Sequence, residues 1–167
     1  MKKLIICAIC AICGITTANA QGKFGHVSTD EIMQAMPETA KMKTDMESLQ
    51  KQYEEEEKSL IAEYQKKIED YQAKEKELPD NIKQRRVQEI GEMEQKIQQA
   101  RQDNAQALQK AYNDRLEPIQ KKVLDAINAV GKEGGFVYIV QQNSLPYIST
   151  TLSTDVTAQV KTKLGLK

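Results

Sequence analysis

The sequence predicts a mainly α-helical protein in which a long antiparallel helical hairpin, a coiled-coil arm, projects from a small β-sheet base. Three observations predict this fold. Apolar residues recur at steps of three and four along two long, highly charged stretches, and a Pro-Asp-Asn turn separates these stretches. Short apolar runs and glycines flank them. The predicted parts are a signal over residues 1–20, an arm over residues 29–133, and a base made of residues 21–28 and 134–167.

Residues 1–20 have the features of a cleaved export signal. Two lysines precede an apolar run over residues 4–15, and Ala-Asn-Ala at residues 18–20 is a small-residue cleavage site. A transmembrane anchor is the alternative, but the run is shorter than the about 20 residues that a membrane requires. A lipoprotein signal at Cys13 is a second alternative, which the preceding Cys-Ala-Ile disfavours. We therefore expect cleavage after Ala20 and an exported protein.

Composition narrows the chemistry of the mature chain. All three cysteines lie within residues 1–20, so disulfide bonds and thiol catalysis are excluded after cleavage. Without Lys2 and Lys3 the chain has 22 basic and 24 acidic residues, a net charge of −2, which gives no bias toward nucleic acid. Trp is absent and Phe occurs twice, so a large conventional core is not expected.

The arm is predicted by a narrow apolar stripe on each of two charged helices. Pro79 cannot continue the incoming helix, and Asp80 or Asn81 can cap the outgoing one. With the tip near residues 78–81, residue i faces roughly residue 159 − i, and apolar positions then meet apolar neighbours along most of the length. Each leg is about 75 Å long at 1.5 Å per residue.

The helices of the arm are predicted to be interrupted or flexible at two places. Pro37 and Pro118 lie at about the same height under this pairing rule, and each removes a helical hydrogen bond. Either they form a shared joint, or Pro37 opens a new helix and Pro118 is tolerated. Midway along the arm, acidic residues 54–57 face residues 103–104 where the apolar stripe has a gap, which predicts a flexible segment.

The base is predicted as a small β unit with one helix against it. Strands are expected over residues 24–28, 136–140 and 146–149, and Asp155 is expected to cap the last helix. The two glycines at residues 134–135 should end the long helix. The base has only 42 residues, near the limit of about 40 below which a domain rarely folds alone. We therefore expect the chains to associate through the base.

Motifs at both ends of the mature chain resemble a known family. They are Phe24-Gly25-His26-Val27 with Ile32 and Pro37-Glu38, then Gly135-Phe136-Val137-Tyr138-Ile139-Val140, and finally Asp155-Val156-Thr157 with Val160 and Leu164. In this order and spacing, around a long charged hairpin, they are similar to the OmpH/Skp family of periplasmic chaperones. The resemblance implies a homotrimer with a barrel-like β body whose arms enclose a cavity. That cavity would hold unfolded outer-membrane proteins without ATP.

The resemblance and the residue pattern together suggest three sets of site residues. Client-binding candidates, rich in flexible thioethers, are Met33, Met36, Met42, Met46, Tyr53 and Tyr112. Candidates for contact with anionic lipid or lipopolysaccharide at the arm tip are Lys83, Arg85 and Arg86. Candidate oligomerisation strands contain Phe24, Val27, Phe136, Val137, Tyr138, Ile139, Val140, Tyr147 and Ile148. The alternatives are that Met42 and Met46 are ordinary seam residues and that the basic tip is solubilising charge.

An enzyme is not expected. The single histidine, His26, stands in a predicted strand where a structural role is favoured, and no Cys or second His offers it a metal partner. No cofactor or metal site and no nucleic-acid partner are predicted. The alternative function is a structural adaptor of the cell envelope whose hairpin tip docks onto another protein.

Overall fold

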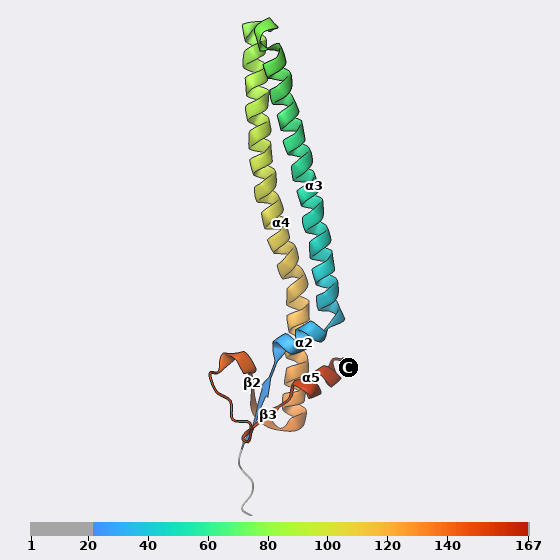
Figure 1. Ribbon diagram of the computed structural model, residues 1–167. Helices are drawn as coiled ribbons and strands as arrows, with labels where there is room; N and C mark the ends of the chain where they lie inside the picture. Colours follow the sequence, from blue (N-terminus) through green and yellow to red (C-terminus); the bar gives the residue numbers. More distant parts are fainter. Residues whose placement is uncertain (1–21, 167) are drawn as a thin grey trace, which may run out of the picture. The chain divides into compact units, whose positions relative to one another are not determined.

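The computed structural model describes residues 22–166, which divide into two compact units (Figure 1). One unit is the hairpin, Met33–Lys122, and the other joins residues 22–32 to residues 123–166. The prediction of a mainly α-helical chain with a long hairpin and a small sheet is confirmed. The predicted signal lies outside the described residues. Among the helices of residues 22–166, none has both the length and the apolar character needed to cross a membrane.

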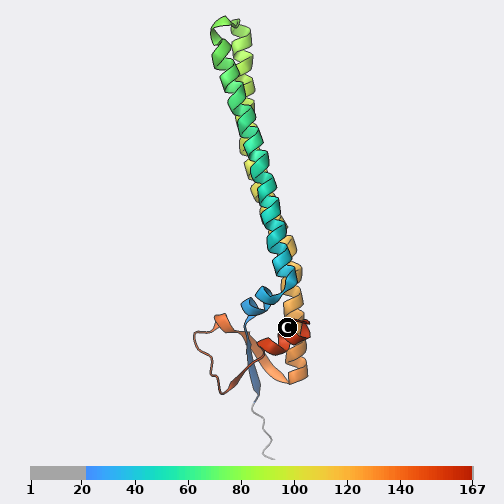
Figure 2. The ribbon, with the colours of Figure 1, turned by 45° about the vertical axis from the view of Figure 1, so that its right-hand side comes forward.

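The hairpin unit consists of two long helices that run side by side in opposite directions (Figures 1 and 2). Helix α3 spans Pro37–Lys74, a short 3-10 helix η1 spans Glu75–Glu77, and helix α4 spans Asp80–Gly134. Leu78 has extended backbone angles and Pro79 follows it. The Pro79 carbonyl accepts hydrogen bonds from the backbone N–H groups of Ile82 and Lys83, so the first turn of α4 closes on the turn residue itself.

Ion pairs between the two helices confirm the predicted pairing. Lys122 contacts Glu38, Arg115 lies 4.0 Å from Asp45, and Arg101 lies 2.7 Å from Glu57. The residue numbers of these pairs sum to 160, 160 and 158. The buried side chains of the seam include Met42, Met93, Ile97 and Ile119. Because exposed ion pairs contribute little free energy, burial of this stripe stabilises the hairpin and the charges set its register.

The incoming helix is broken near its start, at the proline that the sequence predicts to interrupt it. Helix α2 spans Thr29–Ala35, Met36 has extended angles (φ −77°, ψ 128°), and α3 begins at Pro37. A residue before proline avoids the helical region, and proline suits the first helical position because its missing N–H has no partner there. Pro118 lies inside α4. The structure therefore agrees with the second alternative, in which Pro37 opens a new helix and Pro118 is tolerated inside the returning one.

The other unit contains a three-stranded parallel sheet of order β2-β1-β3. Its strands are β1 (Lys23–Val27), β2 (Phe136–Gln141) and β3 (Ser153–Asp155). The short 3-10 helix η2 (Gln142–Ser144) follows β2, and helix α5 (Thr157–Lys163) follows β3. Buried side chains of this unit include Val27, Ile32, Val123, Ala126, Val130, Val156 and Val160.

The predicted strand over residues 146–149 is wrong. Pro146 has no N–H to donate to a ladder, and Ser149 instead closes a turn by accepting hydrogen bonds from the backbone N–H groups of Leu152 and Ser153. The third strand begins only at Ser153, where it pairs with β1. Tyr147 and Ile148, proposed as strand residues, therefore belong to an irregular segment, and the Tyr147 side chain is 79% exposed.

Strand β1 is tied to the end of α4 and to β2 by specific side-chain contacts. The Lys23 ammonium donates to the Gly134 carbonyl at 3.2 Å, at the end of α4, and lies 4.5 Å from the centre of the Phe136 ring. The Phe24 and Tyr138 rings stack with centroids 4.8 Å apart. Gly135 has a φ of 65°, the left-handed conformation that ends a helix. These contacts fix where α4 ends and β2 begins.

Val156 is the N-cap residue of α5, so the prediction of Asp155 at that position is off by one residue. The Asp155 side chain still binds the first residue of the helix, and its charge should make the stability of this unit depend on pH. Its carboxylate accepts the Thr157 backbone N–H at 2.8 Å. Burial opposes ionisation, but hydrogen bonds from Thr157 and the nearby His26 outweigh it, so the pKa of Asp155 lies below its ordinary value. A lowered folded pKa adds stability above the unfolded pKa of about 3.9, and that stability is lost as pH falls through the folded pKa.

Replacing Asp155 with Asn should therefore flatten the acid side of the stability profile. Because asparagine also caps helices, we expect a loss below about 1 kcal/mol at pH 7 and a smaller difference between variant and wild type below pH 3. Urea unfolding at pH 2.5, 4 and 7 measures this. A constant difference at all three values would show that the carboxylate charge is irrelevant to the cap.

Candidate functional site

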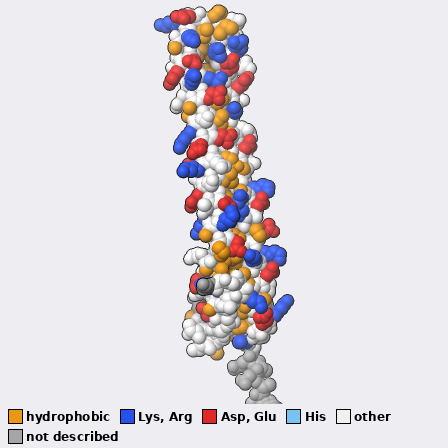
Figure 3. All heavy atoms as spheres, turned by 90° about the vertical axis from the view of Figure 1, so that its right-hand side faces the viewer, with side chains coloured by type: hydrophobic (Ala, Val, Ile, Leu, Met, Phe, Trp, Pro, Cys, Tyr) orange, Lys and Arg blue, Asp and Glu red, His pale blue; other side chains and the backbone are white. Residues whose placement is uncertain are grey.

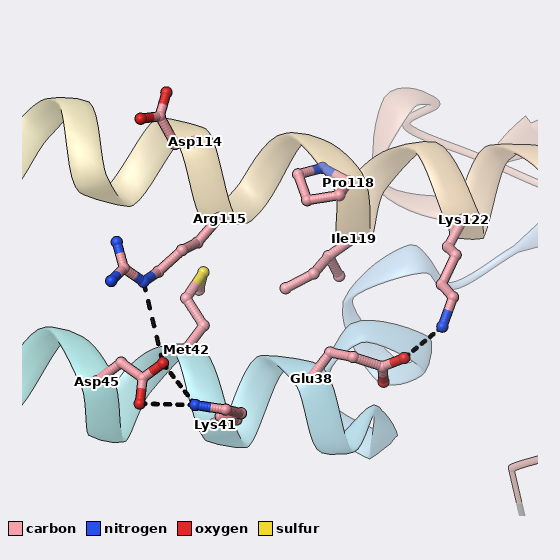
Figure 4. Close-up of a pocket in the computed structure, with 9 residues that line it drawn as sticks. All are labelled: Glu38, Lys41, Met42, Asp45, Asp114, Arg115, Pro118, Ile119 and Lys122. Atoms are coloured by element: carbon pink, nitrogen blue, oxygen red, sulfur yellow. Dashed lines mark hydrogen bonds and ion pairs between the residues drawn. The ribbon is translucent and has the colours of Figure 1, made fainter.

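A groove in the hairpin unit lies between α3 and α4 beside Pro118 (Figure 4). It has a volume of about 460 Å³. Its lining residues are Glu38, Lys41, Met42, Asp45, Asp114, Arg115, Pro118, Ile119 and Lys122. Figure 4 shows the Met42 side chain pointing from α3 toward α4, and the Arg115 and Ile119 side chains pointing from α4 toward α3. This volume lies in the lower part of the range of about 300–1,000 Å³ for small-ligand pockets, so the groove has room for a group as large as an aromatic side chain.

The floor of the groove is apolar because it is formed by buried residues of the hairpin seam. Met42 is 7% exposed and Ile119 is 5% exposed. Pro118 occupies the position of α4 where a helical hydrogen bond is missing. Pro118 nevertheless lies within one continuous helix, so α4 tolerates the missing hydrogen bond. The missing hydrogen bond of α4 thus lies at the level of Lys41 in α3.

The rim of the groove is charged but balanced. It carries three acidic and three basic side chains. Lys122 donates to Glu38, and Lys41 donates to both oxygens of Asp45 at 2.8 and 3.0 Å. The hydrogen bond from the Lys122 ammonium holds the pKa of Glu38 below its ordinary value, so Glu38 is ionised at neutral pH. The rim as a whole therefore has no net charge to attract an ion.

Of the predicted client-binding residues, only Met42 lines this groove. Met36 is 2% exposed, so its side chain contributes to packing and offers no accessible surface in this conformation. Met33, Met46 and Tyr53 are half-buried. Tyr112 is 42% exposed. A role for these residues in client binding stays a prediction.

The basic residues of the tip have acidic partners nearby. Lys83 lies 3.8 Å from Asp80, and both Arg85 and Arg86 contact Glu89, at 3.5 and 2.7 Å. The hydrogen bond from Arg86 lowers the pKa of Glu89 despite opposing desolvation. On the face in Figure 3, basic and acidic side chains alternate over the hairpin. Lipid contact at the tip stays a prediction.

The sheet exposes apolar side chains at and beyond its β2 edge. Among residues 22–166, strand β2 has a neighbour on one side only, because β1 is the central strand. Val137 is 64% exposed and Tyr138 is 52% exposed. The segment that follows β2 adds Leu145, Tyr147 and Leu152, which are 46%, 79% and 73% exposed. An unpaired strand edge flanked by exposed apolar side chains is typical of a surface that another chain covers.

The family model described as outer membrane protein (OmpH-like) matches residues 23–164, which contain the hairpin unit and nearly all of the other unit. The chain belongs to the OmpH-like family. Among solved structures, a Caulobacter crescentus protein described as an outer membrane chaperone (OmpH-like) matches with a TM-score of 0.75 and 10% sequence identity. The match covers 86% of this chain and 83% of that chain, and at this identity it shows a shared fold. No curated protein matches the chain.

In this OmpH-like chain His26 connects two strands. Its Nδ1 atom lies 2.9 Å from the Ser153 hydroxyl, and its backbone carbonyl accepts the Val156 N–H at 2.9 Å. These contacts fix β3 and the start of α5 against β1, as the structural reading of His26 predicts. Within residues 22–166, no three or more His, Cys, Asp or Glu side chains are grouped to hold a metal ion.

Sequence reasoning missed most of the groove in this OmpH-like hairpin. The pairing rule places residue 118 opposite residue 41, so Pro118 alone indicates where along the hairpin the groove lies. The rim residues Glu38, Arg115 and Lys122 gave no separate signal, because charged residues occur throughout both helices. Their selection depends on which side chains reach across the seam.

Proposed function

We propose that this protein is an ATP-independent holdase chaperone of the periplasm, which binds unfolded outer-membrane proteins and prevents their aggregation in transit. The observation that carries the proposal is the hairpin of an OmpH-like chain with an apolar groove in its seam and balanced charge around it. Such a surface can hold apolar side chains of many sequences without selecting one charge. Retention of clients by many weak contacts, and their separation from one another, would prevent aggregation.

The proposed working form is a homotrimer assembled through the sheet-containing unit, with the hairpins of three chains enclosing the client. Two features support the association of chains. The β2 edge exposes Val137 and Tyr138, and few fully buried side chains serve the whole unit. A unit of this size gains most from burying further apolar area against copies of itself. The number three comes from the family resemblance.

The holdase proposal is tested by diluting a urea-unfolded outer-membrane β-barrel protein into buffer that contains residues 21–167 of this chain. We expect light scattering from the aggregating client to be nearly abolished at about one trimer per client, with no nucleotide present. A soluble protein of similar charge serves as the control. Unchanged scattering, together with capture of one folded envelope protein, would favour the adaptor function instead.

A further inference from the structure

Pro118 leaves a hydrogen-bond acceptor without its helical donor at the groove. Proline has no amide hydrogen, so the carbonyl of Asp114, four residues earlier in α4, lacks the N–H that would normally bind it. Both residues line the groove. Asp114, whose side chain points away from α3 in Figure 4, lines the groove together with Met42 and Ile119, and its freed carbonyl is the candidate acceptor there. The best occupant has an apolar body and one hydrogen-bond donor.

The charges around the groove favour an uncharged occupant. Glu38 and Asp45 already have lysine partners on the rim, and Asp114 binds Lys110 outside it. Arg115 lies 4.0 Å from Asp45, so each charged side chain of the rim has a neighbour of opposite charge. A charged ligand would compete with these contacts, whereas a neutral one would not. The rim is thus complementary in charge to a neutral side chain.

The side chains that reach into the groove favour an aromatic ring. The Arg115 side chain donates to the Ala111 carbonyl at 3.1 Å, which holds the guanidinium beside the groove. Guanidinium groups stack on aromatic faces, and thioethers such as that of Met42 make favourable contacts with aromatic rings. Tyrosine and tryptophan combine such a ring with a single donor.

We propose that the groove binds the tyrosine or tryptophan side chains of an unfolded client, with the ring between Met42, Ile119 and Arg115 and the O–H or N–H donating to the Asp114 carbonyl. This inference rests on the proposed holdase function and specifies which client residues are recognised. Transmembrane β-strands carry aromatic girdles at both membrane interfaces, so such side chains recur along every client of this class.

The test uses the methyl signals of methionines labelled with ¹³C in the mature trimer. N-acetyl-tyrosinamide and N-acetyl-phenylalaninamide differ by one hydroxyl and are titrated separately. We expect the Met42 signal to shift with both, while the signal of Met93, which is buried elsewhere in the seam, stays fixed. The tyrosine amide should bind about two- to tenfold more tightly, as expected for one net hydrogen bond.

Pro118→Ala is the decisive variant because it supplies the missing N–H to Asp114. Alanine is favoured inside helices, so the variant should fold at least as well as wild type. We expect the preference for the tyrosine amide to disappear, so that both amides bind with the same affinity, whatever the value of that affinity. Pro37→Ala is the matched control: it removes a proline from the start of α3, where no carbonyl is freed, and should keep the preference.

Three results would overturn the proposal: equal affinity for the two amides in wild type, a preference that survives Pro118→Ala, or an equal Met42 shift with octanoate, which would indicate an aliphatic occupant. The holdase function is judged separately by client aggregation with the wild-type protein. If aggregation is suppressed but no amide moves Met42, the groove proposal fails and the holdase stands. If Met42 shows the preference but aggregation is not suppressed, the holdase fails.

Discussion

Replacing Ile32 with Ala is expected to lower the free energy of unfolding of the sheet-containing unit by about 2–5 kcal/mol. Ile32 is 0% exposed, so the change removes buried methyl and methylene groups and leaves a cavity that the backbone cannot fully close. Total stabilities of about 5–15 kcal/mol are typical, so the loss is a large part of the whole. The loss of unfolding free energy is measured by urea unfolding, with hydrogen exchange of the β1 amides reporting on this unit.

Leu124→Ala is the matched control for this change. It removes a similar apolar side chain from α4, but Leu124 is 57% exposed, so its loss should alter stability by no more than about 0.5 kcal/mol. If the two variants lost equal stability, burial of Ile32 would not be what holds this unit together.

Replacing Val137 and Tyr147 with Asp is expected to separate the proposed trimer into single chains. Both side chains are largely exposed within one chain, 64% and 79%, so neither change removes a buried contact of the chain itself. In the assembly each Asp would be buried without a partner, which costs several kcal/mol. We therefore expect association to weaken about 100-fold or more. Sedimentation across a concentration series measures the change.

Gln142→Asp is the control for this interface, because it adds the same charge to an exposed polar site directly after β2. It should leave the assembly intact. Circular dichroism on both variants establishes that the helices persist. An assembly of unchanged mass in the Val137→Asp, Tyr147→Asp variant would place the association surface elsewhere.

The hairpin was predictable because its signal repeats along the chain. An apolar stripe at steps of three and four, with a turn at Pro79, fixes both the helices and their register, and Arg101 meets Glu57 within one residue of the expected position. Local chemistry also explains the break at Met36, since Pro37 provides it.

The third strand was not predictable in the same way. Residues 146–149 have the composition of a strand, but β3 is the polar Ser153–Asp155, whose strand character comes only from pairing with β1 far away in the sequence. Similarly, four methionines near the start of the arm have similar sequence surroundings, yet Met36 is buried and Met42 lines the groove. Long-range packing decides such differences.

The mass of the mature protein in solution tests the central claim most directly, because the account requires copies of the chain to complete the sheet-containing unit before they can hold a client. Analytical ultracentrifugation, with and without an unfolded outer-membrane protein, gives this mass. We predict one species of three chains that gains the mass of a single client. A single chain that unfolds cooperatively at every concentration and gains no client mass would contradict the account.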